Sequence, residues 1–320
     1  MRPVDSMSLR MCIFLGSLLL ATVPSTSLSD TTLLMRQARI LELDISEEFS
    51  AEDRAELAAW VKFISTSLEQ VYGHWPTRRW RITVSPASAA GADPIPWAQV
   101  HRESLDRVEF FVAPGTTARR LRQEWTGYHE LAHLLIPYRG WGDFWFSEGL
   151  ATYYQNLLRR RAGVLDEQAM WQAFVDGFER GAGDDAFDGQ ALHSVSNAMH
   201  ERGGFMRVYW SGAWYFLKAD ARLRQQSSGR LTLDDALQKL NKCCAHTRLS
   251  VPEMVAKLDA LNQVFVFQPL YDRLRATTSM PDTSSLLASL GVSVISGQVV
   301  LQDNGPGARL RAEIARPDTL

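Results

Sequence analysis

Apolar and acidic residues alternate near the start of the chain, which is typical of a half-buried β-strand. This pattern predicts a strand over residues 36–45. The alternating positions are Leu41, Glu42, Leu43, Asp44 and Ile45. Residues 79–84 and 107–113 are predicted as two further strands, and residues 86–97, rich in Ala, Pro and Gly, as a loop. The first third of the chain is therefore expected to form a small sheet.

Apolar residues recur at helical spacing between the first two predicted strands. Ser50 and Asp53 resemble a capping box at the start of this helix, and Gly73 follows its last residue, Tyr72. The apolar stripe consists of Leu57, Trp60, Val61, Ile64, Leu68 and Val71. We expect this helix to cover one face of the sheet.

The second half of the chain is predicted to be mainly helical. The expected helices span residues 166–180, 208–226, 231–242, 251–262 and 284–290. Residues 292–301 are expected to form a terminal strand, and Asn304-Gly305 a turn. The fold class is thus α+β, with residues 30–163 as a sheet-bearing half, 164–291 as a helical half and 292–320 as a C-terminal tail.

Two histidines stand four residues apart in His129-Glu130-Leu131-Ala132-His133. Positions i and i+4 share one face of a helix, so both imidazoles can bind one metal ion, with Glu130 able to reach a water on it. This H-E-x-x-H arrangement is the one that zinc metalloproteases use. The helix is expected to end at or just before Pro137.

A second helix is predicted over residues 144–161, ending at Gly163. Fourteen residues separate His133 from Glu148, which lies among apolar neighbours on this helix. A carboxylate in such a setting is costly unless a positive group pairs with it. Antiparallel packing of the two helices would bring Glu148 back as the third zinc ligand, with the fourth position left to water.

Two other metal sites are excluded by the same residues. A metzincin requires Gly and His where this chain has Ile136 and Arg139. A di-iron bundle requires a second Glu-x-x-His, and no other glutamate has a histidine three residues later. Zinc, one ion per chain, is the predicted cofactor.

The N-terminus has the features of a signal peptide. Arg2 and Arg10 precede an apolar segment, residues 11–23, which small residues follow. We expect cleavage after a signal peptide of residues 1–29, export to the periplasm or outside the cell, and no stable membrane span afterwards. The alternative is an uncleaved N-terminal anchor.

Composition adds two constraints. The net charge of −2 and the absence of basic stripes argue against nucleic-acid binding. Cleavage would remove Cys12 and leave Cys243 and Cys244, which are adjacent and cannot form an ordinary unstrained bridge. We therefore expect a fold without a disulfide framework.

Peptide hydrolysis would also require a general base and a donor to the oxyanion. Glu130 is the expected base. Tyr209 is a candidate oxyanion donor, with His193 and His200 in the preceding loop as competitors. Thr152, one turn beyond Glu148, is a candidate for supporting a ligand imidazole.

Three blocks of sequence resemble gluzincin peptidases, most closely the glycyl aminopeptidase family. They are residues 128–133, residues 145–154 running on to 163, and residues 209–213 continuing to 235. The resemblance implies a thermolysin-like zincin half, with His129, His133 and Glu148 as zinc ligands. It also implies Glu130 as catalytic base and Tyr209 as oxyanion donor.

The chain departs from related aminopeptidases in two ways. The spacing from His133 to Glu148 is shorter, and the strand that holds the substrate amine through a glutamate has no counterpart between Arg79 and Arg120. Glu103 or Glu109 would have to supply that carboxylate. The expected function is an exported zinc metallopeptidase acting on peptides or proteins. The alternatives are an inert zinc-containing peptide-binding or chaperone-like protein and a non-peptide hydrolase that uses the same zinc-water.

Overall fold

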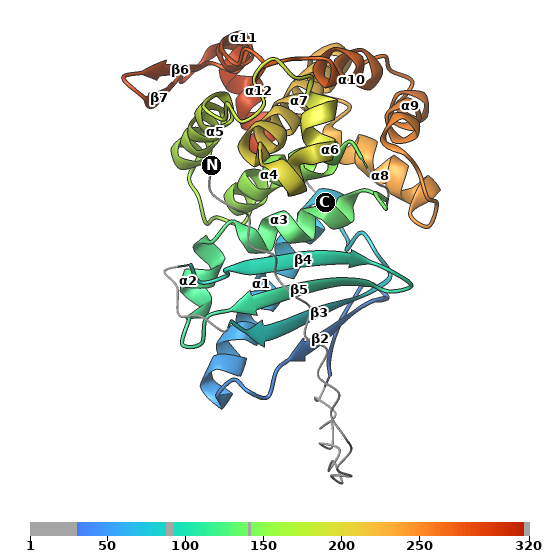
Figure 1. Ribbon diagram of the computed structural model, residues 1–320, viewed down its shortest axis with the longest axis vertical. Helices are drawn as coiled ribbons and strands as arrows, with labels where there is room; N and C mark the ends of the chain where they lie inside the picture. Colours follow the sequence, from blue (N-terminus) through green and yellow to red (C-terminus); the bar gives the residue numbers. More distant parts are fainter. Residues whose placement is uncertain (1–30, 88–92, 140–141, 317–320) are drawn as a thin grey trace, which may run out of the picture.

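The protein combines a five-stranded sheet with a larger helical part that lies along one edge of it (Figure 1). The computed structural model describes residues 31–87, 93–139 and 142–316. The predicted signal peptide lies outside these residues. The mixed architecture, with an N-terminal sheet followed by helices, confirms the expected class at this level.

The sheet has the order β1-β2-β3-β5-β4. The β2–β3 and β3–β5 pairs are parallel, whereas β1 and β4 pair antiparallel with their neighbours. The strands are β1 (Thr32–Arg36), β2 (Arg39–Ile45), β3 (Arg79–Pro86), β4 (Trp97–Arg102) and β5 (Asp106–Val112).

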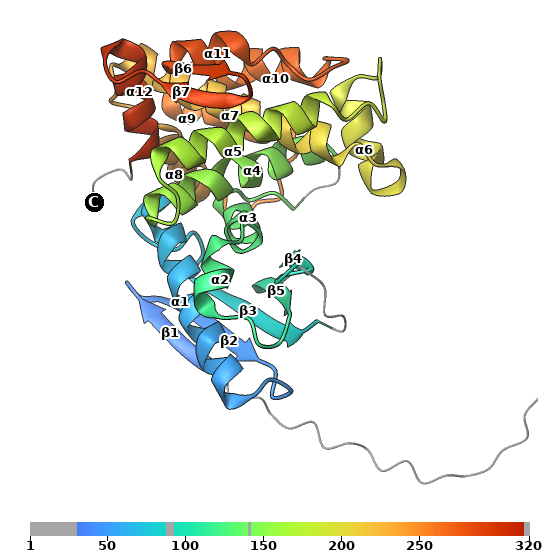
Figure 2. The ribbon, with the colours of Figure 1, turned by 90° about the vertical axis from the view of Figure 1, so that its left-hand side faces the viewer.

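Helix α1 (Ala51–Tyr72) packs against one face of this sheet (Figure 2). Ser50 caps its first turn by accepting a hydrogen bond from the Asp53 amide, and Gly73 ends it in the left-handed conformation, as the sequence predicts. The apolar stripe of α1 meets buried residues of the central strands, and Trp60 lies edge-on against Phe110 at 5.0 Å between ring centroids. This core fixes the sheet beneath the site.

Three short elements connect the sheet to the helical part. They are α2 (Ala118–Gln123), α3 (Thr126–Ala132) and the 3-10 turn η1 (His133–Leu135). Helix α4 (Phe144–Arg161) then packs against α3 and crosses α7 (Phe205–Ser227). Both predicted helices of the His-Glu segment are therefore present, the first ending before Pro137 and the second with the predicted bounds.

The remaining helices surround α4 and α7. They are α5 (Glu167–Ala182), α6 (Leu192–Arg202), α8 (Leu233–Cys244), α9 (Val251–Asn262), α10 (Phe267–Arg275), α11 (Ser284–Ser289) and α12 (Gly305–Ala315). The hairpin of β6 (Val292–Ile295) and β7 (Gln298–Leu301) lies beside α5 and α11. Among the described residues, no helix combines the length and hydropathy needed to cross a bilayer.

Several local expectations are wrong, each for a physical reason. The single strand predicted over residues 292–301 is a hairpin, because Ser296 and Gly297 both take positive φ and turn the chain back. Asn304-Gly305 starts α12 instead of forming a turn, since Pro306 in the first helical turn is preset for a helix. His193 and His200 lie in α6, not in a loop.

The two cysteines at the end of α8 are also paired differently from our expectation. Cys243 and Cys244 form a vicinal disulfide, with Cα atoms 3.7 Å apart, where we expected no bond between adjacent thiols. This bond joins neighbouring residues and ties no distant elements together. Stability across the described residues therefore comes from the core, as expected.

Candidate metal centre

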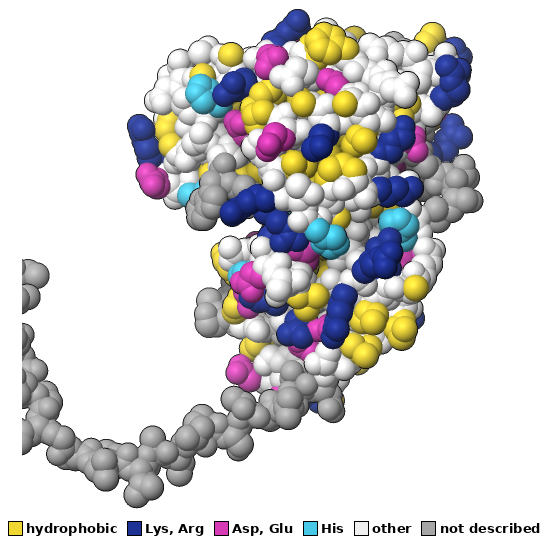
Figure 3. Space-filling view, turned by 90° about the vertical axis from the view of Figure 1, so that its right-hand side faces the viewer, with side chains coloured by type: hydrophobic (Ala, Val, Ile, Leu, Met, Phe, Trp, Pro, Cys, Tyr) yellow, Lys and Arg dark blue, Asp and Glu magenta, His cyan; other side chains and the backbone are white. Residues whose placement is uncertain are grey.

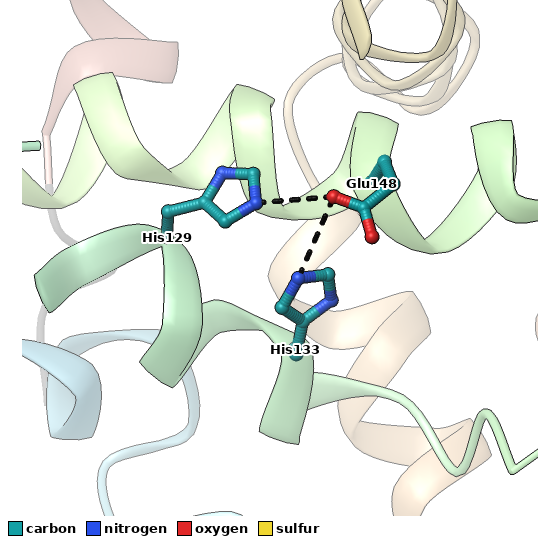
Figure 4. Close-up of side chains that lie close together, drawn as sticks. All are labelled: His129, His133 and Glu148. Carbon is teal, nitrogen blue, oxygen red and sulfur yellow. Dashed lines mark hydrogen bonds and ion pairs between the residues drawn. The ribbon is translucent and has the colours of Figure 1, made fainter. Parts of the chain in front are cut away.

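Two helices bring the three predicted metal ligands together (Figure 4). The Oε2 atom of Glu148, from α4, lies 3.2 Å from Nε2 of His129 and 3.7 Å from Nε2 of His133. One donor atom from each side chain lies within 4.8 Å of the others. The structure thus brings residues of α3, η1 and α4 onto a single point.

The donor set fits a zinc ion. Zinc forms bonds of about 2.0–2.2 Å to His nitrogen and carboxylate oxygen, so tetrahedral geometry separates donor atoms by roughly 3.4 Å. The two distances to Glu148 bracket this value. Two imidazoles and one carboxylate also form the usual ligand set of catalytic zinc, which leaves one position for water.

Hydrogen bonds on the far side of each ring orient the two imidazoles. Nδ1 of His129 lies 2.9 Å from the Oε1 of Gln155, and Nδ1 of His133 lies 3.0 Å from the hydroxyl of Ser147. The Gln155 carbonyl accepts a hydrogen bond from the Nδ1–H of His129, which leaves the Nε2 lone pair for a metal. Ser147 supports the same tautomer in His133.

A residue of the sheet fixes the C-terminal end of the helical segment formed by α3 and η1. Helix α3 tightens into the 3-10 turn η1 at His133, so the carbonyl groups there lack partners in an α-helix. Arg102, the last residue of β4, donates to the carbonyl oxygens of His133 and Ile136. The same guanidinium is fixed by Asp106 at 2.9 Å. The edge of the sheet therefore sets the position of the second histidine.

Glycines at the crossing of α4 and α7 determine how close Glu148 can come to Tyr209. A Cβ atom on Gly212 would lie 2.1 Å from the carbonyl oxygen of Trp145, and one on Gly149 would lie 2.2 Å from the Gly212 Cα atom. Real Cβ contacts are essentially never this short. Only glycine permits this approach, which places Tyr209, one turn before Gly212, beside the ligand cluster.

Tyr209 contacts two of the three candidate ligands. Its ring stacks on that of His129, with centroids 5.7 Å apart, and its hydroxyl interacts with the Glu148 carboxylate. Burial raises the pKa of Tyr209, and Glu148 and Glu130 raise it further. The hydroxyl is therefore protonated at neutral pH and can donate a hydrogen bond.

Glu130 has an environment suited to proton transfer. Burial raises its pKa to about 7, with Glu148 adding to the rise and His129 opposing it. Within the described part of the chain, no hydrogen bond or ion pair engages its side chain. The carboxylate is thus free to exchange a proton near neutral pH.

The ligands themselves carry shifted pKa values. Burial lowers the pKa of His133 to about 4, with His129 and Arg102 adding to the drop, so this ring is neutral at pH 7. Burial acts to raise the pKa of Glu148, but the two histidines and the Tyr209 hydroxyl hold it below its ordinary value. His133 and Glu148 are thus in the forms that bind metal, a neutral imidazole and an ionised carboxylate. Burial acts to lower the pKa of His129, but the Glu148 carboxylate holds it above its ordinary value.

Other candidates from the sequence are placed elsewhere. The Thr152 hydroxyl is buried and has no hydrogen-bond partner among the described residues. Gln155 and Ser147 instead contact the imidazoles in the way expected of Thr152. Gln155 lies two helical turns from Glu148 on the same face, a spacing that could have identified it. His193 faces the carbonyl of Arg275 at 3.3 Å.

His200 and the two candidate amine-binding glutamates also lie outside the ligand cluster. His200 packs against the rings of Phe144 and Phe205. Glu109 pairs with His101 at 3.1 Å and Arg107 at 3.2 Å. The Glu103 side chain is exposed on the β4–β5 turn. Neither glutamate belongs to the group formed by the three ligands.

Known proteins resemble the chain in sequence and in fold. Residues 141–230 match the family described as M61 glycyl aminopeptidase. An aminopeptidase N family protein from Idiomarina loihiensis has a TM-score of 0.61 at 16% identity, over 83% of this chain and 49% of that chain. An M1 zinc metallopeptidase from Deinococcus radiodurans has a TM-score of 0.51 at 15% identity, over 78% and 51%.

These likenesses have clear bounds. The chain spans about half the length of the solved structures it matches. A comparison with curated protein sequences gave no match. At this level of identity the solved structures show a similarity of fold alone. The family match covers the segment that contains Glu148 and Tyr209. In fold the chain is thus similar to M1 zinc metallopeptidases, and in sequence its residues 141–230 resemble the M61 glycyl aminopeptidase family.

Proposed function

We propose that this chain is an exported zinc-dependent metallopeptidase of the H-E-x-x-H…E type, with one zinc ion per chain and a thermolysin-like zincin half. The observation that carries the proposal is the convergence of His129, His133 and Glu148 on one point, with Glu130 and Tyr209 beside it. The apolar segment of residues 11–23 supports export.

The residues around the ligands have separate tasks. Zinc bound by the three ligands would lower the pKa of a bound water to about 7 and polarise the scissile carbonyl. Glu130 takes the proton of the attacking water, as its pKa near 7 allows, and returns it to the leaving amine. The Tyr209 hydroxyl donates a hydrogen bond to the oxyanion.

The pairing of His129 and His133 with Gln155 and Ser147 favours catalysis over an inert zinc site. These hydrogen bonds hold both Nε2 atoms toward Glu148 while Glu130 stays unpaired among the described residues. A purely structural zinc site uses four protein ligands, whereas the described residues supply three at this one. The fourth position is the one that a peptidase requires for water.

The test uses the purified chain without its predicted signal peptide. We expect about one zinc per chain by elemental analysis, cleavage of a quenched-fluorescence peptide library, and loss of cleavage with a zinc chelator. Glu130→Gln should retain zinc and lose at least about 10²-fold in kcat, the range expected for general acid–base catalysis. Glu52→Gln, an exposed acid on α1, serves as the control. Zinc-loaded protein that cleaves no library member would reject the proposal.

A further inference from the structure

A cavity of about 550 Å³ lies where the ends of several strands meet the C-terminal end of α8. Its walls come from the start of β2, the segment before β3, the end of β4 and the start of β5. The 3-10 turn η1 with the residues after it, and the last turn of α8 with the chain just beyond it, complete them. The volume is within the range of about 300–1,000 Å³ that small-molecule sites occupy.

Positive side chains dominate the lining of this cavity. Arg39, Arg78, Arg102 and Lys242 face it, against a single carboxylate, Asp106. Two histidines, His74 and His246, add potential hydrogen-bond donors. Figure 3 looks onto this side of the molecule and shows Lys and Arg side chains gathered with histidines along the seam between the sheet and the helices.

The carboxylate does not neutralise the cations around it. Asp106 is engaged by Arg102 at 2.9 Å and, from outside the cavity lining, by Arg139 at 3.2 Å. Among the residues that the structure describes, Arg39, Arg78 and Lys242 have no carboxylate within ion-pair distance. Lys242 donates a hydrogen bond to the Gln238 side chain, at 3.0 Å. Within the described residues, the side chains of Arg39, Arg78 and Lys242 therefore line the cavity without an ion-pair partner.

The effect of this unbalanced charge is visible on neighbouring groups. Burial lowers the pKa of Arg39, and Arg78 lowers it further. Burial likewise lowers the pKa of His74, and the charges of Arg39 and Lys242 lower it further. Arg39 and Arg78 thus lie close enough to repel each other, and Arg39 and Lys242 both lie close enough to act on His74. A bound anion would relieve this repulsion.

We propose that this cavity binds a small multivalent oxyanion of the phosphate type, either free inorganic phosphate or the phosphate group of a small phosphorylated molecule. Guanidinium groups match the geometry of phosphate oxygens, and two arginines with a lysine supply donors from three separate segments. The site is distinct from the metal centre, because none of the three ligands or Glu130 lines it.

The test is calorimetric titration of the zinc-loaded chain with inorganic phosphate, with glycerol 2-phosphate and with glycerol as the uncharged control. We expect saturable binding of a phosphate compound and none of glycerol. Tighter binding of glycerol 2-phosphate than of phosphate would indicate a phosphorylated molecule as the ligand, and the reverse order would indicate the free ion. Arg78→Gln and Lys242→Gln are the test variants, and both side chains are exposed, so the fold should tolerate the change.

Each substitution should weaken phosphate binding roughly tenfold, because a hydrogen bond to a charged group contributes about that factor. Arg119→Gln, an exposed arginine outside the cavity, should bind as the unaltered chain does. A His129→Ala, His133→Ala double variant controls for phosphate bound to zinc and should retain binding. Absence of saturable binding, equal weakening in Arg119→Gln, or loss of binding in the double histidine variant would each overturn the proposal.

Discussion

Replacing Gly212 by alanine should disable the metal centre by separating two helices. The added methyl group would lie 2.1 Å from the Trp145 carbonyl oxygen and 2.5 Å from the Gly149 Cα atom, whereas ordinary contacts begin at 3.4 Å. Both obstructing atoms are backbone, so no side-chain rotation can relieve the contact. Helices α4 and α7 must therefore move apart by about 1 Å or more.

The separation of α4 and α7 should lower both the rate of catalysis and the free energy of unfolding. Glu148 immediately precedes Gly149, and Tyr209 lies one turn before Gly212, so the shift draws the hydroxyl away from the ligand cluster. A misplacement of about 1 Å can cost roughly 10²-fold in rate. Overpacking a core typically costs about 1–3 kcal/mol in the free energy of unfolding.

The assay measures kcat/KM on one cleaved peptide, zinc content and the thermal midpoint on the same preparations. Gly183→Ala is the matched control, because its φ of −83° suits any residue and its methyl would meet Glu179 at an ordinary 3.4 Å. We expect kcat/KM to fall about 10²-fold in Gly212→Ala while the control keeps the original value. Unchanged kcat/KM and an unchanged midpoint in Gly212→Ala would refute the reasoning.

Three further predictions concern the same site. Tyr209→Phe should lower kcat by about 10²–10³-fold, the usual cost of one oxyanion donor, with KM and zinc content kept; an unaltered kcat would remove this hydroxyl from the mechanism. Gln155→Leu should weaken zinc affinity about 10–100-fold, measured by competition with a chelator, because it removes the hydrogen bond to His129. The control Gln226→Leu, at an exposed position, should leave the affinity unchanged. Equal zinc affinities of the two variants would contradict the role of the Gln155–His129 hydrogen bond. Acetylating the amino terminus of a substrate peptide should change kcat/KM less than about threefold, because the Glu109 carboxylate already pairs with His101 and Arg107 and does not bind the substrate amine. A loss of several orders of magnitude in kcat/KM would instead show that the protein has a binding site for that amine.

Strong local patterns in the sequence predicted the elements that carry the site. Helix α1 has its cap at Ser50 and its end at Gly73, and α4 spans the predicted residues 144–161. Such signals depend on the chain within a few residues and are readable without tertiary contacts. The same holds for the His129–His133 pair, whose spacing places both rings on one face.

The sequence patterns did not predict strands β1 and β4, in which no position is fully buried. Strand β1 is mostly exposed, and its turn at Gln37-Ala38 takes positive φ without the glycine or asparagine that usually marks such a turn. Strand β4 follows a loop and carries a mixed pattern, although it ends in Arg102, which holds the end of the zinc helix. The hydrogen bonds to the ligand imidazoles were missed too. The helical spacing from Glu148 points to Gln155, but its contact with His129, like that of Ser147 with His133, depends on how α4 packs against the preceding helix. The division into domains stays a prediction, as do the roles of the site residues.

The burial of α4 has a consequence for how this centre can change over time. Positions from Gly149 to Leu158 are buried in unbroken succession, so this helix has no water-facing side on which substitutions are cheap. Glu148, the third candidate ligand, is therefore followed by positions at which substitutions would disturb the packing of the interior. Transferring the centre to another protein would require transferring this whole interior, whereas the mostly exposed strand β1 can accept substitutions at little cost.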